Sequence, residues 1–155
     1  MKTPSQTVGP YFAIGLSRRD ESALAERSDP EAKTLVGRLL DGQGVGISDG
    51  MIEIWDGSGW ARSSTDSEGR FGFTVTKPAA AAGGAPHFEV YVFARGLLRH
   101  QWTRLYFPDE PNEGDPVFAA LGEAERRTLV ADDEGGALRF DIRMQGEEAT
   151  VFFEH

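Results

Sequence analysis

Residues 83–96 read GGAPHFEVYVFARG, and this stretch decides the fold class. Between positions 87 and 93 the side chains alternate as they do on a β-strand, and glycines bound the run at both ends. The residues that share one face of this strand are assigned to the core: Phe88, Val90 and Val92. The opposite face is largely apolar too, so the strand needs cover on both sides.

Six further short β-runs, separated by Gly, Asp and Pro turn residues, occupy residues 34–40, 51–55, 70–75, 100–107, 137–144 and 150–154. Short strands with such turns are typical of antiparallel sandwiches and barrels. We therefore predict an all-β fold, an antiparallel β-sandwich of about seven or eight strands with long loops.

Two other elements complete the prediction. Residues 1–15 contain Pro4, Gly9 and Pro10 and are expected to form an extended N-terminal arm, followed by a polar surface excursion over residues 16–33. One short helix is predicted after Asp115, with proline at its first position. No repeat or long linker divides the chain, so residues 1–155 are expected to form a single domain.

Composition restricts the function classes. The formal net charge is −9, which argues against nucleic acid and anionic membranes as partners and leaves small molecules or proteins. The 155 residues include no cysteine, which excludes disulfides and thiolate metal sites and fits a reducing cytoplasm. Neither a signal peptide nor a transmembrane helix is expected, because no long apolar run is present.

His87 and Glu89 face the same way on the predicted strand, and a histidine beside a carboxylate is half of a non-haem metal site. His100 joins them only if the next strand pairs in a favourable register. The simpler interpretation is that His87 caps the strand while Glu89 is solvated or ion-paired, and for a lone His-x-Glu pair it is the stronger one. Ser58 lies in a turn between glycines, so it is not a nucleophile.

Arg95 directly follows the apolar strand and precedes a glycine turn. A guanidinium at a strand end can bind a carboxylate through two parallel hydrogen bonds. From spacing alone, an ion pair with one of the chain's 25 acidic residues is the better interpretation.

Four stretches together resemble one family: TPSQTVGPYF at residues 3–12, PHFEVYVFARGLL at 86–98, TRLYFPDE at 103–110 and RFDIRMQGEEATVFFE at 139–154. The family is the intradiol ring-cleavage dioxygenases, and within it the resemblance is to the α chains of the two-chain, protocatechuate-type enzymes. Residues 35–59 and 64–78 also match the family's strand-turn-strand framework. The resemblance therefore extends, in order, over nearly the whole chain.

The resemblance implies a β-sandwich and a ferric iron, Fe(III), held by two tyrosines and two histidines in a His-x-His pair. Here His87 stands at the first histidine, but Glu89 replaces the second. Neither tyrosine position is filled, since residues 56–60 and 79–85 contain no tyrosine. One ligand of four cannot hold Fe(III) tightly, so no metal is expected on this chain.

The implied role is that of a metal-free α subunit, which completes the pocket of a homologous, iron-bearing β subunit in a larger oligomer. The pair would cleave 3,4-dihydroxybenzoate with O2 between the hydroxylated carbons, giving 3-carboxy-cis,cis-muconate in aromatic catabolism. The family places substrate contacts from the α chain at Thr7, Gly9, Pro10, Tyr11 and Arg95. With this resemblance, carboxylate binding becomes the better interpretation of Arg95.

Two alternatives remain open. One is a stand-alone module that binds an aromatic acid in a degenerate pocket. The other is a self-sufficient metalloenzyme built on His87 and Glu89. Aromatic candidates for anchoring a partner chain are Trp102, Phe107, Phe152 and Phe153.

Overall fold

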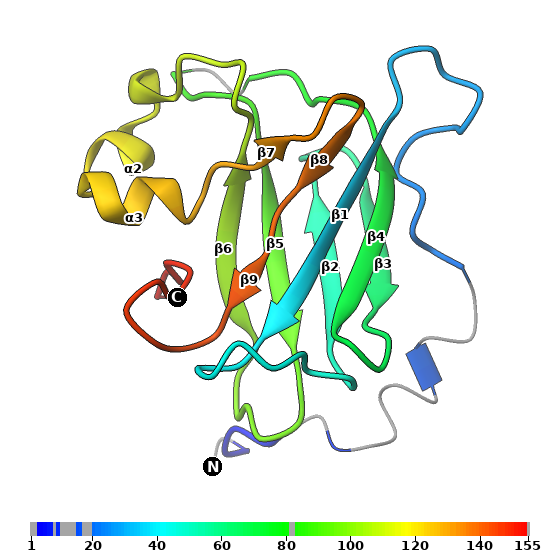
Figure 1. Cartoon of the computed structure of the whole chain (residues 1–155), viewed down its shortest axis with the longest axis vertical. Helices are drawn as coiled ribbons and strands as arrows, with labels where there is room; N and C mark the ends of the chain where they lie inside the picture. The colour runs from blue at the N-terminus through cyan, green and yellow to red at the C-terminus, as the bar shows by residue number, and fades with distance from the viewer. Residues whose placement is uncertain (1–2, 8, 10–14, 17–19, 81–82, 155) are drawn as a thin grey trace.

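The structure is a computed structural model that describes residues 3–7, 9, 15–16, 20–80 and 83–154. Two β-sheets are layered face to face (Figure 1). The first sheet has the order β4 (Arg70–Val75), β1 (Lys33–Leu40), β8 (Ala137–Arg139), β7 (Asp132–Asp133), and β9 (Ile142–Arg143) also pairs with β1. The second has the order β3 (Trp60–Ser64), β2 (Met51–Trp55), β5 (His87–Phe93), β6 (Gln101–Tyr106). The predicted all-β sandwich is confirmed.

Strand pairing is antiparallel throughout the second sheet and between β1 and β4. The first sheet is mixed, because β8 and β9 run parallel to β1. The prediction of antiparallel pairing therefore holds for most of the fold but not for these two short strands.

The core lies between the sheets and is made by alternate residues of each strand. On β5 the inward residues are Phe88, Val90 and Val92, all at most 1% exposed. They pack with residues of the facing sheet, among them Leu35, Phe73 and Ile142. This confirms the assignment of the three β5 residues to the core.

Three segments differ from the sequence prediction. No strand is predicted at residues 60–64, but they form β3, where Arg62 pairs across strands with Glu53 and its charge is neutralised. The run 137–144 is split into β8 and β9 at Asp141, whose carboxylate accepts a hydrogen bond from the Arg38 N–H at 3.0 Å in place of a ladder bond. Residues 150–154 form no strand, only one bridge between Phe153 and Trp102.

The helical region is shorter and more broken than predicted. Asp115 caps α2 (Pro116–Ala119) as expected, accepting hydrogen bonds from the N–H groups of Val117 at 2.8 Å and Phe118 at 3.2 Å. The chain then turns at Gly122, whose N–H donates to Glu125, and a second helix, α3 (Glu123–Arg127), begins. A 3₁₀ turn, η1 (Asn112–Gly114), precedes both.

The polar excursion contributes to the fold. Its residues 20–25 run along the open edge of the sandwich, bridging Glu21 to Arg62 of β3 and Ala23 to Thr74 of β4. Arg62 is only 17% exposed in its side chain and pairs with Glu21 at 3.1 Å as well as with Glu53. The excursion therefore joins the edges of the two sheets.

Candidate functional site

Arg95 lies just after β5, in the connection to β6, at the end of the sandwich that also carries the N-terminus (Figure 1). Its side chain is 63% exposed. Its Nε forms an ion pair with Asp49, a residue of the turn before β2. The guanidinium is therefore held at its base and open to solvent beyond.

The N-terminal arm lies beside this turn. The N–H of Gly96 donates to Oγ1 of Thr7 at 3.3 Å, and Nε of Arg99 donates to Oγ of Ser5 at 3.3 Å. Residues 3–7 form neither helix nor strand, as expected of an arm. The structure thus brings Thr7 and Arg95 to neighbouring positions.

Gly9 has φ of +68°, a left-handed conformation that favours glycine, and nothing lies within 4 Å of where a Cβ would be. Its backbone can therefore be approached closely by another molecule. Pro10 and Tyr11, the other two residues predicted to contact substrate, lie outside the described residues.

Two hollows adjoin this end. One of about 250 Å³ is lined by Gln6 of the arm together with residues 93–94 and 97–100. Another of about 370 Å³ lies on the outer face of the second sheet, lined by Glu53, Trp55, Gly57, Glu89, Tyr91, Phe93 and His100. Trp55 and its neighbour Trp60 are 41% and 40% exposed, so this outer face is aromatic and only partly covered in the described part of the chain.

The other end of β5 carries His87. Its Nδ1 lies 2.8 Å from the carbonyl oxygen of Ala85, so Nδ1 carries the proton and donates it. The ring also packs against Tyr106, with centroids 5.3 Å apart. A histidine fixed in this way could ligate a metal through Nε2, so its neighbours decide the question.

Glu89 is engaged by its own chain. Its Oε2 accepts a hydrogen bond from the Tyr91 hydroxyl at 3.0 Å, and its Oε1 lies 3.9 Å from Arg104. Burial, together with the Glu89 and Glu53 carboxylates, raises the pKa of Tyr91 to about 12. Tyr91 is therefore a phenol rather than a phenolate at neutral pH.

His100 does not join His87. The β5–β6 register pairs His87 with Tyr106 and Val92 with Gln101, so His100 falls opposite the far end of β5. At about 3.3 Å per residue, the six positions between them correspond to about 20 Å. His100 packs instead against Tyr91 and Phe93, with centroids 5.4 Å apart in each pair.

These residues do not fit an iron site of the kind the family implies. Across the described ranges, no three His, Cys, Asp or Glu side chains gather into a group that could hold a metal ion. Of the described tyrosines, Tyr91 is protonated and bonded to Glu89, while Tyr106 is fully buried.

A buried polar network closes the His87 end. Asp115, 2% exposed, accepts from the Tyr106 hydroxyl at 3.2 Å and lies 3.5 Å from Arg104. Burial raises the pKa of Asp115, but the N–H groups of Phe118, Val117 and Ala85 and the charge of Arg104 outweigh it, so the pKa lies below its ordinary value. His87, Glu89, Tyr106 and Asp115 are thus engaged within the chain at this end, while the buried Nε of Arg104 has no hydrogen-bond partner among the described residues.

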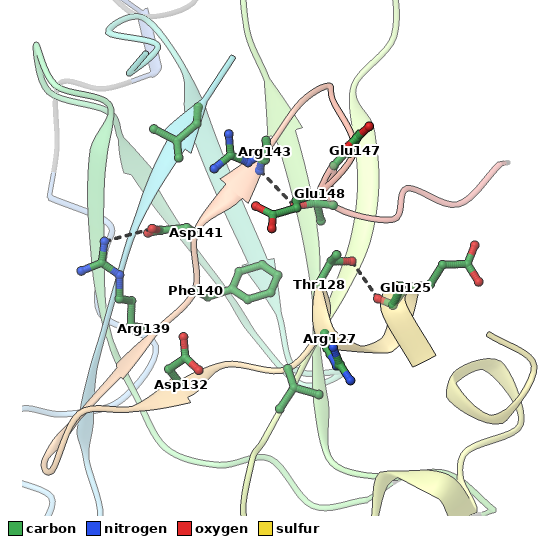
Figure 2. A pocket seen from close by; sticks show the side chains of 15 residues that line it. Glu125, Arg127, Thr128, Asp132, Arg139, Phe140, Asp141, Arg143, Glu147 and Glu148 are labelled. Carbon is green, nitrogen blue, oxygen red and sulfur yellow. Dashed lines mark hydrogen bonds and ion pairs between the residues drawn. The ribbon is translucent and has the colours of Figure 1, made fainter. Parts of the chain in front are cut away.

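A third hollow, of about 440 Å³, lies against the first sheet and α3 (Figure 2). Figure 2 shows charged side chains of both signs around it, with Arg139 turned to Asp141. That pair lies at 2.9 Å, and Thr128 donates to the Glu125 carbonyl at 2.8 Å. Some of its polar groups pair with one another in this way, and it includes none of the predicted site residues.

Of the four aromatic residues predicted to anchor a partner chain, Phe107 does not do so. It is 1% exposed and packs inside its own chain against Phe88, with centroids 5.5 Å apart, because the chain turns inward after β6. Trp102 and Phe153 pack on each other at 5.3 Å and are half-buried, as is Phe152.

Sequence reasoning missed Asp49. The signal was present in the turn SDG before β2, but its relevance depends on the β2–β5 register, which pairs Met51 with Phe93. Two residues beyond that pair, Asp49 falls opposite Arg95.

Sequence comparison with known proteins identifies the family of this chain. The chain is 39% identical over 191 residues to the protocatechuate 3,4-dioxygenase alpha chain of Burkholderia cepacia, a match covering 99% of this chain and 97% of that protein. It is 37% identical over 193 residues to the alpha chain of Pseudomonas putida, with 99% and 96% covered. The beta chain of Burkholderia cepacia is 28% identical over 157 residues, covering 77% of this chain and 67% of that protein. No family model matches the chain.

Solved structures agree on the fold. The dioxygenase domain of a dioxygenase carbohydrate-binding protein fusion from Streptomyces sp. SirexAA-E has a TM-score of 0.63 and 24% identity, covering 94% of this chain and 99% of that one. Hydroxyquinol 1,2-dioxygenase from Pseudomonas putida DLL-E4 has a TM-score of 0.64 and 20% identity, covering 94% and 67%. Among the described residues no helix is long and apolar enough to cross a membrane. The chain belongs to the family of protocatechuate 3,4-dioxygenase alpha chains and has the intradiol dioxygenase fold.

Proposed function

We propose that this chain is the metal-free α subunit of a protocatechuate 3,4-dioxygenase, active in complex with a homologous β subunit. The observation that carries the proposal is the contrast in its own side chains: Arg95 is exposed, whereas His87 and Glu89 are engaged inside the chain. The Fe(III) is held by the β subunit. The complex cleaves 3,4-dihydroxybenzoate with O2 between its hydroxylated carbons.

In this proposal Arg95 binds the substrate carboxylate. A guanidinium offers two parallel N–H donors whose spacing matches a carboxylate, which both attracts the anion and orients its ring. The positive charge also matters locally, because the chain as a whole is acidic, with a formal net charge of −9.

The arm supplies the second contribution. Thr7 is held beside the Arg95 turn by the Gly96 N–H. Gly9 lets the backbone approach a flat ring, and Pro10 offers a rigid apolar surface without an unsatisfied N–H. Tyr11 follows directly. In this proposal Thr7, Gly9 and Arg95 form one wall of a pocket completed by the partner, and the family resemblance adds contacts from Pro10 and Tyr11, which lie outside the described residues.

The test is Arg95→Ala in the assembled complex. The catalytic efficiency kcat/KM for protocatechuate should fall by a factor that corresponds to a loss of about 1–3 kcal/mol of transition-state stabilisation. The iron content should be unchanged. Arg127→Ala is the matched control, because Arg127 is 74% exposed and is also ion-paired, to Glu123 on α3.

An equal loss for a catechol that lacks the carboxylate would indicate damage to assembly and contradict substrate binding. Tight binding of an aromatic acid by the chain without any β subunit would favour the stand-alone binding module instead.

A further inference from the structure

We infer that Asp49 is a positioning residue that sets the selectivity for carboxylated substrates by orienting Arg95. This inference rests on the proposed role of Arg95. Its own basis is the ion pair between the Asp49 and Arg95 side chains, together with the β2–β5 strand register that brings their two turns together.

The pair is a product of strand register. In β2 and β5, Met51 lies opposite Phe93, and side chains two residues apart share a face. Asp49 and Arg95 lie in the turns two residues beyond this last pair, so the β2–β5 register brings these two turns together at one end of the sheet.

The burial of the two partners is unequal. The side chain of Asp49 is 29% exposed, and that of Arg95 is 63% exposed. The Oδ2 atom of Asp49 is buried, and among the described residues Arg95 Nε is the cationic group at ion-pair distance from it. The aspartate is the fixed partner, and the arginine reaches outward from it.

The atoms used leave the arginine able to bind a second anion. Asp49 contacts Nε, whereas the two terminal nitrogens form the other edge of the planar guanidinium. That edge alone can donate two parallel hydrogen bonds to a substrate carboxylate. Within the described residues, Asp49 is the one carboxylate at ion-pair distance from Arg95.

The ion pair with Asp49 restricts the long Arg95 side chain at Nε. Less conformational entropy is therefore lost when its terminal nitrogens bind a ligand. Asp49 also adds a negative charge that weakens the attraction for a substrate anion, so the two effects have opposite signs. The geometry favours orientation, because the Asp49 carboxylate and the bound substrate would contact different edges of the guanidinium.

A double-mutant cycle in the complex with the β subunit tests the inference. The variants are Asp49→Ala, Arg95→Ala and the double variant, with Asp49→Asn as the conservative substitution. Each is assayed with protocatechuate and with 4-methylcatechol, which keeps both hydroxyls but has a methyl group in place of the carboxylate. The readout is the ratio of the two kcat/KM values.

We expect Asp49→Ala to lower this ratio 3- to 10-fold through KM for protocatechuate, with kcat nearly unchanged. Asp49→Asn should recover most of the loss, because the amide oxygen still accepts from Nε. In the Arg95→Ala background, Asp49→Ala should have no further effect. A cycle on Glu123 and Arg127 of α3, away from this end, is the control and should leave the ratio unchanged.

Three results would overturn the inference: equal losses for both substrates, a loss that persists without Arg95, or a gain in affinity for protocatechuate, which would mean that Asp49 competes with substrate. An unchanged ratio in Arg95→Ala would instead contradict the proposed function itself, so the two failures are distinguishable.

Discussion

The two ends of strand β5 differ in how their polar side chains are satisfied. At the His87 end, the side chains of His87, Glu89, Tyr106 and Asp115 all have hydrogen-bond or ion-pair partners within the chain. At the Arg95 end, an exposed guanidinium is ion-paired with a half-buried carboxylate beside the N-terminal arm. One strand thus has a closed end suited to stability and an open end suited to recognition.

Under the proposed function, this difference lets the subunit support an enzyme without holding its metal. At the closed end Glu89 accepts from a phenol and Asp115 caps a helix. The open end keeps a group that reaches beyond the chain. Mutations at the closed end should change stability, and those at the open end should change substrate selectivity.

The largest effect is expected for Asp115→Ala. Asp115 accepts from Val117, Phe118 and the Tyr106 hydroxyl, and its removal leaves Arg104 buried without this partner. The free energy of unfolding should fall by about 2–4 kcal/mol, measured by urea denaturation. Asp133→Ala, in the exposed strand β7, is the control and should cost no more than about 1 kcal/mol, since it removes one exposed hydrogen bond from Gly135 and a long ion pair with Lys33.

The same residue predicts a pH dependence. Because the pKa of Asp115 is lowered in the folded state, its stabilisation is fully present above its unfolded pKa of about 3.9 and is lost as the pH falls toward the folded value. In Asp115→Asn, the loss of stability on acidification should be shallower than in the wild type. Parallel curves would contradict the assignment.

Smaller losses of stability are expected when either tyrosine near this end is replaced by phenylalanine, and the two losses should differ. Tyr91→Phe removes one half-exposed hydrogen bond to Glu89 and should cost about 0.5–1.5 kcal/mol in the free energy of unfolding. Tyr106→Phe removes a fully buried hydroxyl bonded to Asp115 and should cost more, about 1–3 kcal/mol. The reverse order would contradict the description of the closed end.

Alternation and turn chemistry were enough to predict the sandwich, since β1, β2, β4, β5 and β6 all follow apolar periodicity. They could not predict β3, because its residues are polar and Arg62 becomes acceptable on a strand only when Glu53 and Glu21 surround it. They also overextended the C-terminal run, since a side-chain acceptor at Asp141 interrupts the ladder. The local pattern of apolar and polar residues carries no information about such partners, which are distant in the sequence.

The site was predictable in the same uneven way. Spacing alone favoured an ion pair for Arg95, such as the one it forms with Asp49, and its substrate-binding role was implied by the family resemblance. The extended arm was predictable from its prolines. The contact between Asp49 and Arg95 was not predictable, because it depends on the register of β2 and β5. In that register Met51 pairs with Phe93, a residue more than forty positions away in sequence. The separation of His100 from His87 likewise required the β5–β6 register.

The most direct measurement is the iron content and oxygen uptake of this chain purified alone and purified with a co-expressed β subunit. We predict no stoichiometric iron and no turnover of protocatechuate for the chain alone, and one iron per αβ pair with turnover in the complex. Stoichiometric iron together with ring cleavage by this chain alone would contradict the account.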